Sequence, residues 1–211
     1  MISINQLKVI LVLSVILWAI VLSIKQVPLS IDLWSPYPIV LAILSAIMWI
    51  YDKWLWKWWI IHRWFVKTPN INGTWKGHLR TTYVDTATKK PAEKEIFYMS
   101  ICQTYSKLFI RAVFKRSSSV LKISSIEKSD DDQYMVGGIY TNEPQLSERA
   151  SSPIHYGGVF ITIVGNPPTE LKGQYWTDRN TAGEFELSEW SPGQHQDYAN
   201  ADKIKFKKIG E

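Results

Sequence analysis

The sequence predicts a membrane protein with a hairpin of two transmembrane helices, followed by an all-β domain folded as a compact eight-stranded antiparallel barrel. Three observations predict this class. Two apolar runs without charged residues, 9–24 and 33–51, lie near the start of the chain, and a tryptophan-rich basic stretch follows at 54–64. Beyond it, short segments of alternating polarity recur between turn residues. We therefore expect a transmembrane segment over 1–67 and one soluble domain over 68–211.

The apolar runs have the length that membrane helices require. The second run approaches the ~20 residues of a spanning helix, and the first is adequate if Lys8 and Lys25 extend toward the headgroups. Two alternatives remain. A cleaved signal peptide lacks support because residues 20–25 contain no small-x-small cleavage pattern. A buried helical pair would need a larger soluble domain to cover two helices that are apolar all round.

Basic residues predict the orientation of the hairpin. The connection between the two runs carries only Lys25, whereas the segment after the second run carries four basic residues, namely Lys53, Lys57, Arg63 and Lys67. Because basic residues accumulate on the cytoplasmic side, both termini are expected in the cytoplasm. The tryptophans of 54–64 would lie in the interfacial aromatic belt, against the lipid bilayer.

Charge and composition exclude several functions of the soluble part. Residues 68–211 hold 18 Lys/Arg and 17 Asp/Glu, so the surplus of positive charge lies mainly before residue 68. This balance argues against a protein that coats duplex nucleic acid. The single cysteine excludes an internal disulfide, and the four scattered histidines argue against a metal site. The common catalytic motifs are also absent from the sequence, so we expect no catalytic residues and no enzyme.

The soluble part predicts eight strands in chain order, which indicate an antiparallel barrel or sandwich; a closed barrel would also leave no exposed sheet edge. The first, 73–83, places Trp75, Leu79 and Thr81 on one face. Serines 117–119 and aspartates 130–132 predict turns, 143–153 predicts a polar loop, and the glycine pair 137–138 predicts a bend or bulge. A short final element is expected at 203–209. The predicted strands are 73–83, 95–104, 107–115, 120–127, 133–142, 154–164, 170–177 and 183–190.

Polar and aromatic residues that share strand faces are the candidate site. Three such pairs are Cys102 and Thr104, Tyr140 and Asn142, and Tyr175 and Thr177. If these faces point inward, the barrel offers aromatic planes, hydroxyls and an amide, which suit a stacked and hydrogen-bonded base. Arg179 would pair with a phosphate. In the alternative interpretation the aromatics only fill the barrel, and Arg179 pairs with Asp178 or a carbonyl.

Two motifs add a resemblance to a known family. They are Gly-Thr-Trp-Lys-Gly at 73–77 and Gly-Gln-Tyr-Trp-Thr-Asp-Arg-Asn-Thr-Ala-Gly-Glu at 173–184. Together with the amino-terminal hairpin, they resemble the two-transmembrane, β-strand-rich effector family of the bacterial cyclic-oligonucleotide-based anti-phage systems (CBASS). The similarity extends over essentially the whole chain.

The resemblance implies a cytosolic barrel that is a receptor for a cyclic dinucleotide made by a co-encoded nucleotidyltransferase. Binding would drive homo-oligomerisation, disrupt the bacterial inner membrane and kill the infected cell. The cyclic dinucleotide would be an activating ligand, and no other cofactor is expected. The motif positions give Trp75, Tyr175, Thr177 and Arg179 as ligand-binding residues; Thr104, Tyr140 and Asn142 come from strand phase alone.

Two other functions compete with this one. A membrane-anchored, lipocalin-like carrier of an apolar ligand would need a continuous apolar lining in place of the hydroxyls and the amide. An enzyme with an unrecognised site would need a coherent cluster of acid and base groups, which the sequence does not offer.

Overall fold

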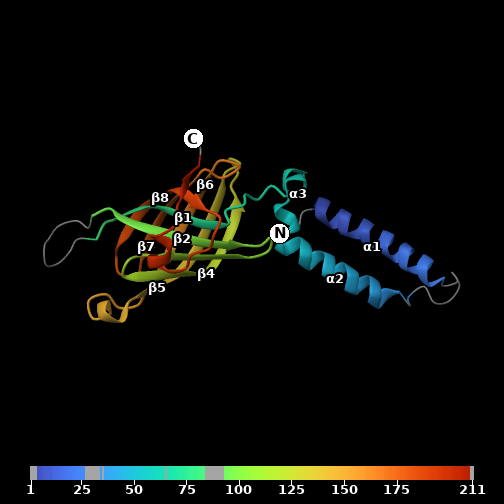
Figure 1. Ribbon diagram of the computed structural model, residues 1–211, viewed down its shortest axis with the longest axis horizontal. Coiled ribbons are helices and arrows are strands. Elements are labelled where there is room, and N and C mark those ends of the chain that lie inside the picture. Colours follow the sequence, from blue (N-terminus) through green and yellow to red (C-terminus); the bar gives the residue numbers. More distant parts are fainter. Residues whose placement is uncertain (1–3, 27–33, 35, 65, 84–92, 210–211) are drawn as a thin grey trace. The chain divides into compact units, whose positions relative to one another are not determined.

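A computed structural model of the protein describes residues 4–26, 34, 36–64, 66–83 and 93–209. The chain divides into two compact units, Met1–Lys67 and Thr68–Glu211, whose elements are labelled in Figure 1. Each unit is described by itself.

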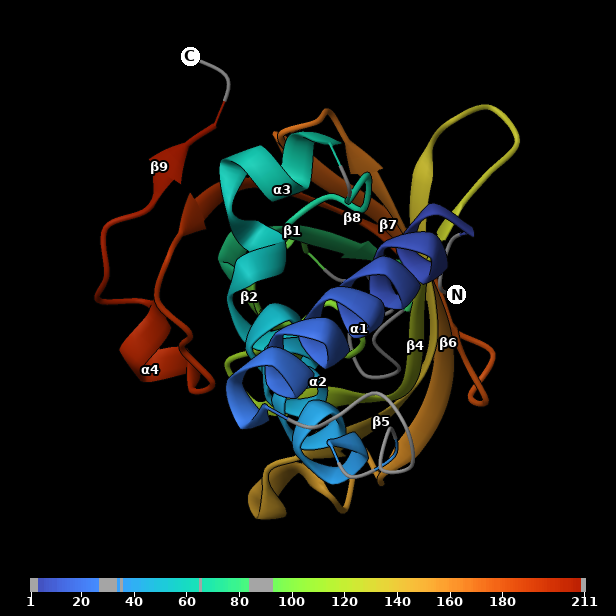
Figure 2. The same cartoon turned by 90° about the vertical axis from the view of Figure 1, so that its right-hand side faces the viewer.

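The first unit is helical. It contains α1 (Ile4–Lys25), α2 (Tyr37–Lys53), the 3-10 turn η1 (Leu55–Lys57) and α3 (Trp59–Trp64). Helices α1 and α2 lie side by side in Figures 1 and 2, and the rings of Trp18 and Trp34 pack with centroids 5.6 Å apart. Pro38 lies in the first turn of α2, where a missing N–H costs nothing. Residues 27–32 of the predicted connection, 25–32, lie outside the described residues.

Helix α1 has the properties of a membrane span. Its stretch Leu7–Lys25 is 19 residues long with a mean hydropathy of 2.7, and only 6% of it is buried. Helix α2 has 17 residues, the lower limit for crossing a bilayer, and α1 alone among the described helices is both long and apolar enough. Signal sequences share the length and hydropathy of α1, so the transmembrane hairpin stays a prediction.

The second unit is a closed antiparallel barrel, as predicted. Each strand pairs with the next in the chain, and β1 also pairs with β8, which closes the sheet. Strand β9 continues the edge of β8 beyond the end of β7, through Glu189 and Trp190. The strands are β1 (Gly73–Thr81), β2 (Glu95–Gln103), β3 (Leu108–Val113), β4 (Ser117–Lys128), β5 (Tyr134–Pro144), β6 (His155–Val164), β7 (Glu170–Thr177), β8 (Ala182–Ser191) and β9 (Lys207–Lys208).

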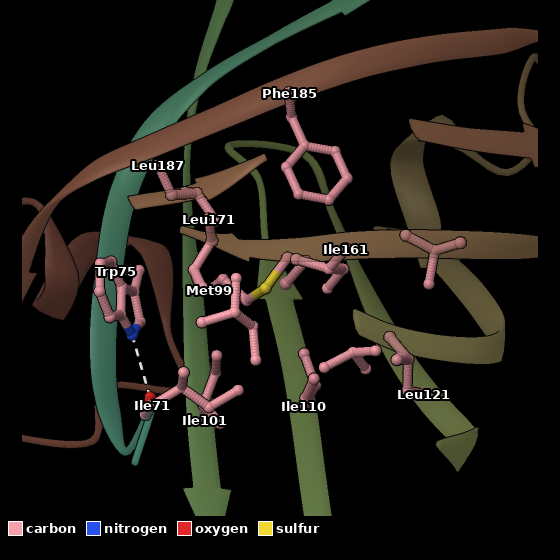
Figure 3. Close-up of a cluster of buried hydrophobic side chains, with 14 of the residues drawn as sticks. Ile71, Trp75, Met99, Ile101, Ile110, Leu121, Ile161, Leu171, Phe185 and Leu187 are labelled. Atoms are coloured by element: carbon pink, nitrogen blue, oxygen red, sulfur yellow. Dashed lines mark hydrogen bonds between the residues drawn. The ribbon is translucent and has the colours of Figure 1, made fainter. Parts of the chain in front are cut away.

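Apolar side chains fill the half of the barrel where β1 begins. Figure 3 shows apolar side chains from several strands pointing toward one another inside the barrel. Trp75 is 1% exposed, and its indole Nε1 donates to the carbonyl of Ile71 at 3.0 Å. This half is therefore a packed core. Its buried members include Ile71, Trp75, Ile101, Ile110, Val136, Ile161, Ile163, Leu171 and Leu187.

The segment that leads into β1 is fastened to this closed end. The side chain of Gln103, at the end of β2, accepts from the Ile71 N–H at 2.9 Å and donates to the Pro69 carbonyl at 3.0 Å. Asn72 and Gln103 exchange two further bonds, at 2.7 and 3.0 Å. The Trp190 indole donates to the Asn72 carbonyl at 2.7 Å. The entering chain therefore forms part of the core.

Two bulges set the faces of the neighbouring strands. Ser188 is the extra residue of β8 opposite β1, and Lys122 is the extra residue of β4 opposite β5. The predicted irregularity at glycines 137–138 lies instead on the partner strand. A Cβ at Gly138 would lie 2.7 Å from the Ile123 carbonyl oxygen, which explains why glycine faces the bulge.

A further expectation was wrong. Residues 117–119 form the start of β4, because the hairpin turn lies earlier, where the Phe114 N–H donates to the Ser117 carbonyl. The short final element expected within 203–209 is confirmed as β9, which is limited to Lys207–Lys208. The sequence also gave no sign of α4 (Tyr198–Ala201), which lies beside β2 in Figure 2. There the Tyr98 hydroxyl donates to Asp202 at 2.6 Å.

Candidate functional site

The half of the barrel opposite the packed core is open and contains a cavity of about 580 Å³. Its walls are the inward-facing residues where β1, β3, β5 and β7 end and where β2, β4, β6 and β8 begin. A volume of this size falls in the range of small-molecule sites. Its apolar lining includes Phe97, Met99, Leu121, Val159 and Phe185.

A second hollow, of about 640 Å³, lies on the outer wall between β6 and β1. Its charged groups largely neutralise one another, since Arg80 pairs with Glu184 at 3.7 Å and Lys172 with Glu186 at 3.9 Å. The cavity inside the barrel is smaller, but it combines aromatic, hydroxyl, amide and guanidinium groups. We therefore take the interior cavity as the functional site.

Two tyrosine rings lie against glycines in the cavity wall. A Cβ at Gly157 would collide with the ring of Tyr140, and a Cβ at Gly183 would collide with the ring of Tyr175. Burial raises the pKa of both phenols, so both stay neutral at physiological pH. The rings thus offer uncharged aromatic surface to the cavity, as predicted from strand phase.

The polar groups of the wall come from β4, β5 and β7. The Asn142 amide Nδ2 donates to the Ser119 hydroxyl at 2.8 Å, and its buried Oδ1 has no hydrogen-bond partner among the described residues. The hydroxyls of Thr177 and Thr181 lie 2.7 Å apart. Hydroxyls and a carboxamide can exchange hydrogen bonds with the edge of a base.

Arg179 lies at the mouth of the cavity, in the turn between β7 and β8. Its Nη1 donates to the Ser152 hydroxyl at 3.0 Å and lies 3.5 Å from His155 Nδ1. Asp178 accepts instead from the Tyr156 N–H, and no ion pair joins Arg179 to Asp178 in the described part of the chain. A hydroxyl and an imidazole contact the guanidinium, and no carboxylate pairs with it in the described part of the chain.

Two of the predicted site residues lie elsewhere. Trp75 faces the barrel interior but belongs to the packed core, away from the cavity lining. Thr104 follows the end of β2, where its hydroxyl accepts from the Lys107 N–H at 3.0 Å and stabilises a turn. The inward face of β2 is the one that carries Phe97, Met99 and Ile101, opposite to the phase of Cys102 and Thr104. The structure thus brings together Tyr140, Asn142, Tyr175, Thr177 and Arg179.

Sequence reasoning missed several residues of the lining, among them Ser117, Ser119 and Arg116. The two serines belong to the stretch 117–119 that was predicted as a turn, so their alternation was not considered, and Arg116 lies between that stretch and the strand predicted at 107–115. Glu95 was also missed, because it was treated only as the first residue of a strand. Burial raises the pKa of Glu95, while a backbone hydrogen bond at Lys115 and the charge of Arg116 oppose the shift. The serine spacing at 117 and 119 was a signal that could have found the face.

Comparisons with known proteins agree with this geometry. Residues 66–189 match the family described as Cap15, cyclic dinucleotide receptor domain, which is more than half of the chain. The match begins before β1 and ends within β8, so it covers the cavity. A relative from Staphylococcus schleiferi, CD-NTase-associated protein 15, is 27% identical over 139 residues, covering 65% of this chain and 69% of the relative. The chain therefore belongs to the family of Cap15 cyclic dinucleotide receptor domains.

Proposed function

We propose that the protein is a non-enzymatic CBASS receptor that binds a cyclic dinucleotide in the barrel cavity and acts on the bacterial inner membrane. The observation that carries the proposal is the cavity of about 580 Å³ with neutral aromatic rings, hydroxyls, an amide and arginines at its mouth. Membership of the Cap15 receptor family supports the class of ligand. The name of the relative, CD-NTase-associated, supports a partner enzyme that makes the ligand.

The cavity residues divide the work of recognition. A base can stack on the ring of Tyr140 or Tyr175, a contact worth about 1–3 kcal/mol per base. Asn142 and Thr177 supply hydrogen-bonding groups for the base edges or riboses. Arg179 pairs with a phosphate, because a guanidinium fork matches phosphate oxygens.

The helical unit is the output device in this proposal. Ligand binding promotes self-association of the receptor and gathers the helices in the plane of the membrane, where they disrupt the bilayer. The apolar surface of α1 supports this role, since Val15 is 66% exposed and Ile24 is 76% exposed within the chain itself. Such side chains need a lipid or protein environment.

The binding step is tested with the full chain in detergent, titrated calorimetrically with a panel of cyclic dinucleotides. At least one ligand should bind, and Arg179→Ala should weaken it by about tenfold or more, because a charge-assisted hydrogen bond is lost. Arg80→Ala is the matched control, since Arg80 lies on the outer wall and pairs with Glu184. If no member of the panel binds while a fluorescent fatty acid does, the protein is a carrier of apolar ligands instead.

A further inference from the structure

Two arginines stand on opposite sides of the cavity mouth. Arg116 lies in the turn between β3 and β4, and Arg179 lies in the turn between β7 and β8. In a closed sheet of eight consecutive strands, these turns are four strands apart in either direction. Both side chains line the same cavity. The topology therefore places the two turns that carry the arginines on opposite sides of the mouth.

One loop between the two turns contacts both arginines. Within the connection from β5 to β6, Glu148 Oε2 lies 3.6 Å from Arg116 Nη1, and the Ser152 hydroxyl accepts from Arg179 Nη1 at 3.0 Å. The loop is compact, because the Ser152 N–H donates to the Glu148 carbonyl at 2.8 Å. One short turn thus contacts both guanidinium groups.

The carboxylates near Arg116 hold it only loosely. The Arg116 side chain is 73% exposed, and an exposed ion pair of this kind contributes little to stability. The charge of Arg116 also acts on Glu95, whose carboxyl lines the same cavity. A phosphate with bidentate geometry is a stronger partner for a guanidinium than a single distant carboxylate oxygen. Without ligand, Arg116 therefore pairs weakly with Glu148, and a phosphate can replace Glu148 as its partner.

We propose that Arg116 and Arg179 each bind one of the two phosphates of the cyclic dinucleotide. This inference rests on the proposed function and adds a second phosphate site. The ring of a cyclic dinucleotide contains two phosphodiesters that join its two nucleosides, so it presents anionic groups on two sides. A linear dinucleoside monophosphate has one phosphodiester and can engage one arginine at a time. The mouth therefore selects the cyclic ligand by two-point attachment, with Glu148 as the group that phosphate displaces from Arg116.

The test compares two ligands on wild type and four variants of the full chain. The ligands are the best-binding cyclic dinucleotide of the panel and the linear dinucleoside monophosphate with the same bases. Wild type should prefer the cyclic ligand, and Arg116→Ala and Arg179→Ala should each reduce that preference by about tenfold. Glu148→Gln should tighten binding of the cyclic ligand by about two- to fivefold, because it removes the competing carboxylate.

Arg80→Ala again serves as the control and should leave the preference unchanged. Equal losses for both ligands in Arg116→Ala would mean a general charge effect and would overturn the two-phosphate assignment. An unchanged preference in Arg116→Ala, with a loss in Arg179→Ala, would also overturn it while the proposed function stood. Failure of wild type to bind any cyclic dinucleotide would reject the proposed function itself. Melting temperatures of all variants, measured without ligand, confirm that the fold is intact.

Discussion

The positions of Tyr140 and Tyr175 depend on glycines that could not be replaced by any other residue without displacement of a ring. Gly157 lies under Tyr140 and Gly183 under Tyr175, on the neighbouring strand in each case. The missing side chains let each ring lie flat along the wall, so the rings line the cavity without filling it. At the scale of single residues, the open volume of the cavity depends on the lack of a side chain at Gly157 and Gly183 as well as on the tyrosine rings.

Replacement of Gly157 tests this role. In Gly157→Ala the new methyl group would collide with the Tyr140 ring and with the Trp176 carbonyl oxygen. The variant should unfold with about 1–3 kcal/mol less stability, and its affinity for the ligand should fall because the ring moves into the cavity. Thermal unfolding and calorimetry measure the two effects.

Gly137→Ala is the matched control. A Cβ at Gly137 meets only the Phe160 ring, at 3.4 Å, on the outer wall of the same barrel. Its stability and its affinity should stay close to those of wild type. Equal behaviour of the two alanine variants would contradict the role assigned to Gly157.

The site could be predicted from sequence where strand phase was regular. Tyr140, Asn142, Tyr175 and Thr177 alternate without interruption up to the ends of β5 and β7, so their shared faces were visible. The prediction that Thr104 faces the interior was wrong because alternation separates two faces of a strand but does not say which face is inside. Both faces of β2 carry buried side chains. Arg116 was missed because position at a rim depends on turn lengths, which alternation does not encode.

At the scale of elements, β2 connects the two ends of the barrel. Glu95, Phe97 and Met99 line the cavity at its start, and Gln103 holds the entering chain at its end. The same antiparallel strand therefore contacts both the ligand site and the segment that leads from the helical unit. A displacement of β2 on ligand binding has a direct route to that segment.

Gln103→Leu removes this fastening. The Ile71 N–H and the Pro69 carbonyl would remain buried without their partner, which costs about 1–3 kcal/mol for each group. The melting temperature should fall, whereas the affinity for ligand should change little because Gln103 does not line the cavity. Gln174→Leu, on the exposed outer face of β7, provides the comparison. A normal melting temperature in Gln103→Leu would show that the fastening is dispensable.

Element boundaries show which sequence signals are dependable. Alternation between turn residues indicated eight antiparallel strands in a barrel or a sandwich, the family resemblance implied the barrel, and the barrel is confirmed. The serines at 117–119 misled because serine favours turns, yet here the hydroxyls of Ser117 and Ser119 face a polar cavity where a strand tolerates them. Helix α4 has four residues, too few for a helical period to be recognised.

At the scale of the whole molecule, the proposal assigns detection and output to separate units. Deletion of residues 1–67 should leave ligand binding intact and abolish killing, because the deleted part carries α1 with its 19-residue apolar stretch. Loss of membrane potential after induced expression, with and without ligand, measures the output. Full killing by the truncated protein would show that the helices are not the effector.

Barrel closure has a consequence for the order of synthesis. Every strand from β2 to β7 pairs only with its neighbours in the chain. The second edge of β1 pairs with β8, so Trp75 cannot pair with Trp190 until β8 has been synthesised. Such a long-range pairing forms late. The apolar helices therefore leave the ribosome well before a ligand cavity exists. If the barrel inhibited the helices until ligand bound, the helices of every nascent chain would be active before the barrel had folded. If ligand binding to the barrel activates the helices, as proposed, the helices of an unfinished chain stay inactive.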